Sequence, residues 1–158
     1  MLLEIDGGHA GIRFSACHFI PMHDKCSRLH GHSYIMRLRL EGDVGDNGMV
    51  MDFVDLKKAL RGFVDEYDHM TLLPGKSKEV RITQADDSVE VLTCGKRYVF
   101  PKGDVKILPV AVTTAEEMAR LFTRMLLERV PFPRNVRSVS VGIDEERGQT
   151  AWHTEDLA

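Results

Sequence analysis

The run of residues from 29 to 41 alternates between two kinds of side chain, and this period of two predicts one long β-strand. One face of the expected strand carries His30, His32, Tyr34, Met36, Leu38 and Leu40. The other face carries Arg37, Arg39 and Glu41. Because one face is largely apolar and the other charged, we expect this strand to lie in a sheet that is covered on one side only.

Similar patterns predict the other elements. In chain order they are strands at 12–20 and 29–41, a helix at 53–67, an inserted β-hairpin at about 78–108, a helix starting in the TTAEE stretch at 113–117, and strands at 137–145 and 150–153. Asp52 is a suitable N-cap for the first helix, and Thr113 or Thr114 for the second. We expect one α+β domain over residues 1–158, in which two helices cover one face of an antiparallel sheet.

Composition and charge exclude several classes of function. The net charge of −3 gives no support to a nucleic-acid or membrane-surface partner. No apolar run approaches the ~20 residues that span a bilayer. The first residues lack the basic start and apolar middle of a signal peptide, so we expect a cytoplasmic protein. Its three cysteines, Cys17, Cys26 and Cys94, make a poor disulfide framework.

Three histidines are expected to converge on the covered face of the sheet. His30 and His32 are two residues apart on one strand and project together, and His18 projects from the preceding strand. Three buried imidazoles need a shared partner for their nitrogen atoms, and Zn²⁺ is a suitable one. Three protein ligands with a fourth position open are typical of a catalytic zinc site. The alternative is that His30 and His32 flank a turn and that His18 is an ordinary core residue.

Cys26 lies four residues before His30, in the connection between the two strands. It is either a fourth ligand, which would close the zinc site and make it structural, or a free thiol near the metal. In the second case the metal and Lys25 would lower the pKa of the thiol and favour the thiolate. Cys17 faces away from His18 and is interpreted as a packing residue, as is Cys94.

Two further groups contain titratable side chains. Asp68 and His69 follow the first helix, where a carboxylate can orient an imidazole in a proton relay, or where the histidine can simply favour the helix C-terminus. Glu145 ends an otherwise apolar strand face. Its carboxylate either reaches solvent or makes a bidentate contact with a planar heterocycle.

Six motifs together resemble the 6-pyruvoyltetrahydropterin synthase / 6-carboxytetrahydropterin synthase family. They are FSACH, CSRLHGHSY, GMVMDFVDLK, the DH at 68–69, TTAEE and VGIDEE, and they cover most of the chain outside 78–108. The resemblance implies a tunnelling fold, or T-fold, whose copies assemble into a barrel, commonly a homohexamer, with active sites between subunits. Such assembly would also pair the exposed edges of a short open sheet.

The same resemblance assigns roles to individual residues. It places zinc on His18, His30 and His32; catalysis on Cys26, with Asp68 and His69 as a proton relay; and the pterin ring on Glu145, with Thr113 or Thr114. The implied substrate is 7,8-dihydroneopterin triphosphate. In the carboxy-forming branch, which the C-x-x-x-H-G-H spacing favours, the products are 6-carboxy-5,6,7,8-tetrahydropterin, acetaldehyde and triphosphate, on the route to 7-deazaguanine bases such as queuosine.

Three rival functions remain at the level of sequence. The pyruvoyl-forming branch eliminates triphosphate and keeps the side chain. A folate-precursor branch typically has a glutamate near the cysteine, and Ser27, Arg28 and Leu29 offer none. A non-catalytic zinc-stabilised oligomerisation or binding module would use Cys26 as the fourth ligand. The sequence also departs from the family: MTLLPG follows His69 without the asparagine often found there, and the insertion is long.

Overall fold

A seven-stranded mixed sheet forms the body of the protein in the computed structural model, which describes residues 1–157. The strand order is β10-β9-β3-β2-β4-β8, with β1 also paired to β3. The strands are β1 (Leu2–Ile5), β2 (Arg13–His18), β3 (His30–Gly42), β4 (Met70–Pro74), β8 (Val105–Leu108), β9 (Val136–Asp144) and β10 (Ala151–Asp156). No helix among residues 1–157 has the length and apolar character that crossing a bilayer requires.

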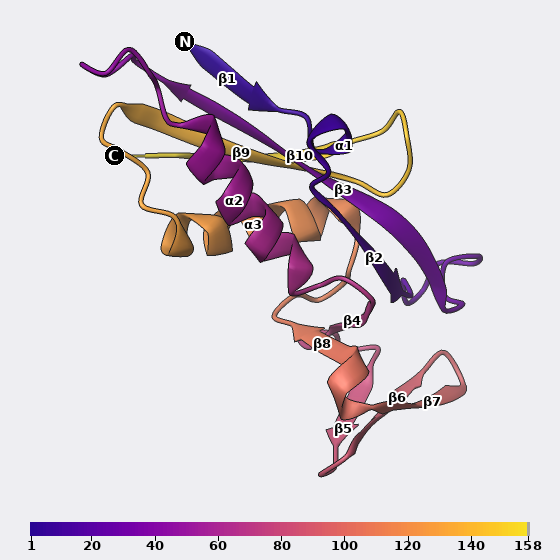
Figure 1. Ribbon diagram of the computed structural model, residues 1–158. Helices are drawn as coiled ribbons and strands as arrows, with labels where there is room; N and C mark the ends of the chain where they lie inside the picture. The colour runs from indigo at the N-terminus through magenta and orange to yellow at the C-terminus, as the bar shows by residue number, and fades with distance from the viewer. Residues whose placement is uncertain (158) are drawn as a thin grey trace.

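Two long helices cover one face of this sheet, as Figure 1 shows. They are α2 (Phe53–Asp65) and α3 (Ala115–Arg129); a third, α1 (Gly7–Ala10), is a single turn after β1. The Asp52 side chain accepts from the Val54 N–H and caps α2, and Thr114 caps α3 by accepting from the Glu117 N–H. The core forms where the apolar face of β3 meets the helices, and its fully buried residues include Tyr34, Met36, Leu38, Leu40, Leu56, Leu60 and Phe122.

The predicted α+β class and the two histidine-bearing strands are confirmed, but the prediction of a wholly antiparallel sheet is wrong. Strand β4 pairs parallel to β2, and β8 pairs parallel to β4. Both strands are short, and β4 is buried over 71–74, so it reads as a continuous apolar run without alternation. A run of this kind carries no period from which a strand can be recognised. Strand β1 and helix α1 were also not predicted.

The inserted segment is larger in structure than the predicted hairpin and ends earlier in sequence. The antiparallel strands β5 (Arg81–Gln84), β6 (Ser88–Thr93) and β7 (Lys96–Pro101) form a separate three-stranded sheet. The two strands of the predicted hairpin are β5 and β6, and β7 adds a third, while the predicted range of 78–108 wrongly included β8, which belongs to the main sheet. Figure 1 shows the small sheet projecting from the end of the main sheet where β4 and β8 lie. A second apolar cluster joins the two sheets; it contains Phe19, Leu73, Val80, Val89 and Val91.

A buried ion pair lies at the end of β9 on the sheet face away from the helices. The Asp144 side chain is 1% exposed and accepts from Arg37 Nε at 2.9 Å, while Arg37 Nη1 lies 2.8 Å from Asp6 Oδ1. The Thr150 hydroxyl donates to the same carboxylate of Asp144 at 2.6 Å. These bonds fix the backbone immediately before Glu145.

Replacing Arg37 by methionine should destabilise the fold strongly, because it leaves the buried Asp144 carboxylate without its cation. We expect the free energy of unfolding to fall by about 3 kcal/mol in denaturant titrations at neutral pH. The matched control is Arg39→Met, two residues along the same face, whose partner Glu4 is 41% exposed. That variant should lose no more than about 1 kcal/mol. Equal losses of unfolding free energy in the two variants would contradict the claim that burial of Asp144 makes its ion pair the more important one.

Candidate metal and substrate site

Three imidazoles meet because of the register between β2 and β3. His18 lies opposite His30 in the antiparallel ladder, and Ala16 lies opposite His32. The side chains of His18, His30 and His32 therefore share one face at the end of the two strands. Their ring centroids are 4.6, 5.2 and 5.1 Å apart, and one nitrogen from each ring lies within 4.8 Å of the others. The predicted convergence of the three histidines is confirmed.

Hydrogen bonds fix which nitrogen of two of these rings faces the common centre. His18 Nδ1 lies 2.9 Å from the Thr113 carbonyl oxygen, and His30 Nδ1 lies 2.7 Å from that of Arg28. A carbonyl oxygen can only accept, so Nδ1 carries the proton in each ring. The Nε2 atoms of both rings are then left as lone-pair donors. This arrangement is the one that orients ligating histidines in metal sites.

The third ring supplies the strongest sign that a partner atom belongs at this centre. His32 Nε2 is buried and has no hydrogen-bond partner within residues 1–157. A buried nitrogen without a partner is costly, and an ion held by all three rings would remove that cost. The donor set of three neutral imidazoles fits Zn²⁺ in chemistry and number, with a fourth coordination position left for another ligand.

Burial keeps the central histidine neutral. His18 is 1% exposed, and desolvation is the main cause that lowers its pKa from 6.5 to about 4. Charges on His30 and His32 would lower the pKa further, while the bond to the Thr113 carbonyl opposes the shift. Neutral imidazole is the form that binds a metal, so His18 is ready to act as a ligand at physiological pH.

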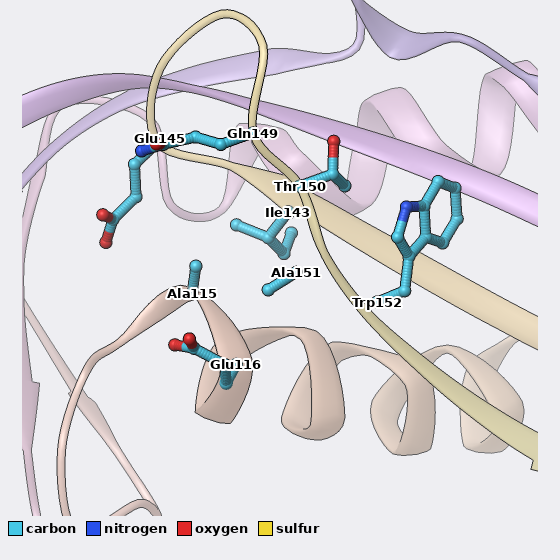
Figure 2. Close-up of a pocket in the computed structure, with 8 residues that line it drawn as sticks. All are labelled: Ala115, Glu116, Ile143, Glu145, Gln149, Thr150, Ala151 and Trp152. Carbon is cyan, nitrogen blue, oxygen red and sulfur yellow. The ribbon is translucent and has the colours of Figure 1, made fainter.

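Glu145 reaches toward this group from the end of β9, so solvent is not its main environment. Its Oε1 lies 3.9 Å from His18 Nε2, and burial raises the pKa of its carboxyl group. The residue also lines a pocket of about 380 Å³ between β9, β10 and the start of α3. Figure 2 shows the carboxylates of Glu145 and Glu116 at one end of this pocket and the Trp152 ring at the other. The predicted carboxylate is thus placed where it could contact a planar ligand.

The two threonines before α3 have different structural roles. Thr113 is fully buried, and its carbonyl orients His18. Thr114 is half-buried and caps α3. Sequence reasoning missed the part that Arg28 plays through its carbonyl, because no side-chain pattern marks a backbone acceptor.

Cys26 lies in a turn between β2 and β3 and is half-buried. Its carbonyl accepts from the Ile20 N–H at 2.7 Å, and its own N–H donates to His23 Nδ1 at 3.1 Å. Within the described chain, the atoms grouped within 4.8 Å of one another come from the three histidines and do not include the Cys26 sulfur. In this geometry the Cys26 thiol lies outside the group of three histidines.

Asp68 and His69 form a pair beside β2, after the end of α2. His69 Nδ1 lies 2.8 Å from Asp68 Oδ2, and the other oxygen of Asp68 accepts from the Ser15 N–H. Because the N–H of a strand residue points along the sheet plane, this bond places the pair beside β2 at the start of β4, where His69 and His32 both line a cavity of about 420 Å³. No hydrogen bond among residues 1–157 joins His69 to any of the three histidines. His32 and His69 therefore border one cavity without a direct hydrogen bond between them.

Comparison with known proteins identifies close relatives. The model of the 6-pyruvoyl tetrahydropterin synthase family matches residues 9–156. A protein from Methanocaldococcus jannaschii is 36% identical over 99% of this chain and 98% of its own length. It is named as a 6-carboxy-5,6,7,8-tetrahydropterin synthase, an assignment marked there as not established. The 6-carboxy-5,6,7,8-tetrahydropterin synthase of Aquifex aeolicus is 32% identical over 68% of this chain and 60% of its own length.

A solved structure supports the same grouping. It is the 6-pyruvoyltetrahydropterin synthase of Plasmodium vivax, in a variant with a catalytic glutamate replaced by alanine. Its chain is 28% identical to this one, with a TM-score of 0.92 over 99% of this chain and 98% of that chain.

Removing one of the three imidazoles should abolish tight binding of a zinc ion. We expect His32→Ala to weaken Zn²⁺ affinity by more than roughly 100-fold, because changes to groups that merely support a ligand already cost 10- to 100-fold. Competition with a chromogenic chelator measures the affinity. His9→Ala is the matched control, because that histidine is exposed and lies outside the group. Unchanged affinity in His32→Ala would contradict the assignment.

Proposed function

Because the chain belongs to the 6-pyruvoyl tetrahydropterin synthase family, we propose that it is a zinc-dependent 6-carboxy-5,6,7,8-tetrahydropterin synthase. In this proposal it converts 7,8-dihydroneopterin triphosphate to 6-carboxytetrahydropterin, acetaldehyde and triphosphate, in the cytoplasm, as a step toward 7-deazaguanine bases. The observation that carries the proposal is the group of three imidazoles beside Glu145, in which His32 Nε2 is buried without a hydrogen-bond partner among residues 1–157.

We assign the Zn²⁺ ligands to the Nε2 atoms of His18, His30 and His32. A zinc ion held there would act as a Lewis acid that polarises a bound hydroxyl or carbonyl group of the substrate. The protein's own part is to hold the three rings in one tautomer and orientation. The Thr113 and Arg28 carbonyls do this for His18 and His30.

Glu145 is proposed to bind the pterin ring, and Thr113 or Thr114 to help hold it. Two carboxylate oxygens can accept together from an N–H and an amino group that lie side by side on a heterocycle. The position of Glu145, 3.9 Å from His18 Nε2, would keep the ring's side chain near the metal ligands. Its partial burial strengthens these bonds by excluding water.

Cys26 is proposed to act as the base that removes a proton from the substrate's side chain, and His69, oriented by Asp68, to return one. Because no hydrogen bond among residues 1–157 joins this pair to the three histidines, we propose that a neighbouring copy supplies it. In this proposal residues 1–158 form a single T-fold domain, and copies assemble into a barrel, most simply a homohexamer.

The pyruvoyl-forming reaction is a second candidate, supported by the TM-score of 0.92 with the Plasmodium vivax 6-pyruvoyltetrahydropterin synthase. That protein has a catalytic glutamate. In this chain the connection from 19 to 29 contains Cys26 and no glutamate, so it differs from that protein; the preference for the carboxy-forming reaction rests on the C-x-x-x-H-G-H spacing and on the relatives named for it. The two reactions differ in product mass and in the release of acetaldehyde.

Product analysis tests the proposed reaction. Zinc-loaded protein should release acetaldehyde and 6-carboxytetrahydropterin from 7,8-dihydroneopterin triphosphate, and Cys26→Ser should keep zinc and lose at least roughly 100-fold in kcat, as expected for a general base. Cys17→Ser is the control, because serine can keep the hydrogen bond to Thr71 and the side chain faces away from His18. A pterin that keeps its side chain after losing triphosphate would contradict the carboxy-forming assignment.

Chelation separates the enzyme from a zinc-stabilised binding module. The main core lies between the sheet and the helices and does not depend on the histidine group, so removal of zinc should leave the circular dichroism spectrum unchanged while activity is lost. A structural zinc site supplies folding energy, and a module built on one would unfold with chelator. Unfolding of the metal-free protein at 25 °C would therefore contradict the enzyme assignment.

A further inference from the structure

The connection between β2 and β3, residues 19–29, lies against the small inserted sheet. We call this connection the thiol loop, because it carries Cys26. The loop joins the two strands that hold the histidines, and it has hydrogen bonds of its own. They include Ile20 N–H to the Cys26 carbonyl at 2.7 Å and Ser27 N–H to the His23 carbonyl at 3.0 Å. The inserted sheet supplies further contacts at both ends and in the middle of the loop.

The first contact is apolar and lies directly after His18. Phe19 is fully buried in the cluster that joins the two sheets. Its ring stacks on that of Tyr98 in β7, with centroids 5.9 Å apart and planes inclined by 9°. Tyr98 in turn stacks on Phe100. The start of the thiol loop is therefore held by packing against β7.

The second contact involves the two-residue turn between β6 and β7. Cys94 and Gly95 form this turn, and both have positive φ, 49° and 71°. Such turns prefer asparagine at the first of these positions, so Cys94 is held in an unfavourable conformation. The backbone N–H of Met22 in the thiol loop lies close enough to the Cys94 sulfur to lower the pKa of the thiol. Met22 also has positive φ, 66°, so two strained residues meet at this contact.

The third contact lies beside Cys26. Lys96, the first residue of β7, is half-buried, and its Nζ donates to the Ser27 carbonyl at 3.2 Å. The next carbonyl along the chain, that of Arg28, accepts from His30 Nδ1. The Lys96 ammonium group thus anchors the peptide between Cys26 and β3, the strand that carries His30 and His32.

From these three contacts we propose that the inserted sheet fixes the thiol loop and that Lys96 is a positioning residue for Cys26. The role of Cys26 in this statement rests on the proposed function. Without the Lys96 bond the loop keeps its two other contacts, so the expected change is a looser Cys26 rather than an unfolded loop. A displacement of about 1 Å at a reacting group is enough to lower a rate by roughly 100-fold.

The test compares Lys96→Met with Lys96→Arg and with Lys102→Met in the full chain. Methionine removes the ammonium group and keeps much of the length, whereas arginine can still donate to a carbonyl oxygen. Lys102 is a matched control, because its Nζ donates to the Ala85 carbonyl within the inserted segment and does not touch the thiol loop. The readouts are zinc content, kcat and KM, and hydrogen exchange of the peptide that covers 20–28.

In Lys96→Met we expect exchange in 20–28 to become faster by roughly tenfold. We also expect kcat to fall by roughly 10- to 100-fold, with KM and zinc content close to those of the wild type. Lys96→Arg should recover most of both changes, and Lys102→Met should show neither.

Unchanged exchange and kcat in Lys96→Met would overturn the proposal, as would loss of zinc, which would place the effect of the lysine at His30. A wild-type protein that does not convert the pterin triphosphate would refute the proposed function alone. The exchange comparison between Lys96→Met and Lys102→Met would still decide whether Lys96 holds the loop.

Discussion

The antiparallel pairing of β2 with β3 is the constraint on which the site depends. It sets His18 opposite His30 and brings His32 to the same face, so three imidazoles lie with their centroids about 5 Å apart. A shift of one residue in this register would turn one set of rings to the other face of the sheet and separate the group. Within the described residues 1–157, His32 Nε2 is buried without a hydrogen-bond partner, and this is the clearest sign that the group has a ligand to hold.

The rest of the fold supports this face. The segment before α3 supplies the Thr113 carbonyl that orients His18, and the Arg37–Asp144 pair fixes the end of β9 just before Glu145. The inserted sheet packs against the connection that carries Cys26. Each supporting interaction comes from a different part of the sequence, so the candidate site is a product of the whole fold and not of the HGH motif alone.

The sequence predicted the elements with a clear period and missed those without one. Alternation identified both histidine-bearing strands and the shared face of their rings. The buried run of β4 has no alternation, so its parallel pairing was not foreseen. From the sequence, Cys26 could be either a fourth metal ligand or a free thiol near the metal. The spacing of residues does not determine the conformation of a loop, so it did not decide between them. The position of Asp68 and His69 beside Ser15 depends on the packing of α2 against the sheet, which no local pattern encodes.

X-ray absorption at the zinc edge of the zinc-loaded protein tests the central claim most directly. If the three imidazoles hold the ion and leave a fourth position open, the spectrum will show only nitrogen and oxygen neighbours at about 2.0–2.1 Å, with the multiple scattering of histidine rings. A sulfur neighbour at about 2.3 Å would make Cys26 a ligand. It would contradict both the open coordination position and the separate role given to the thiol.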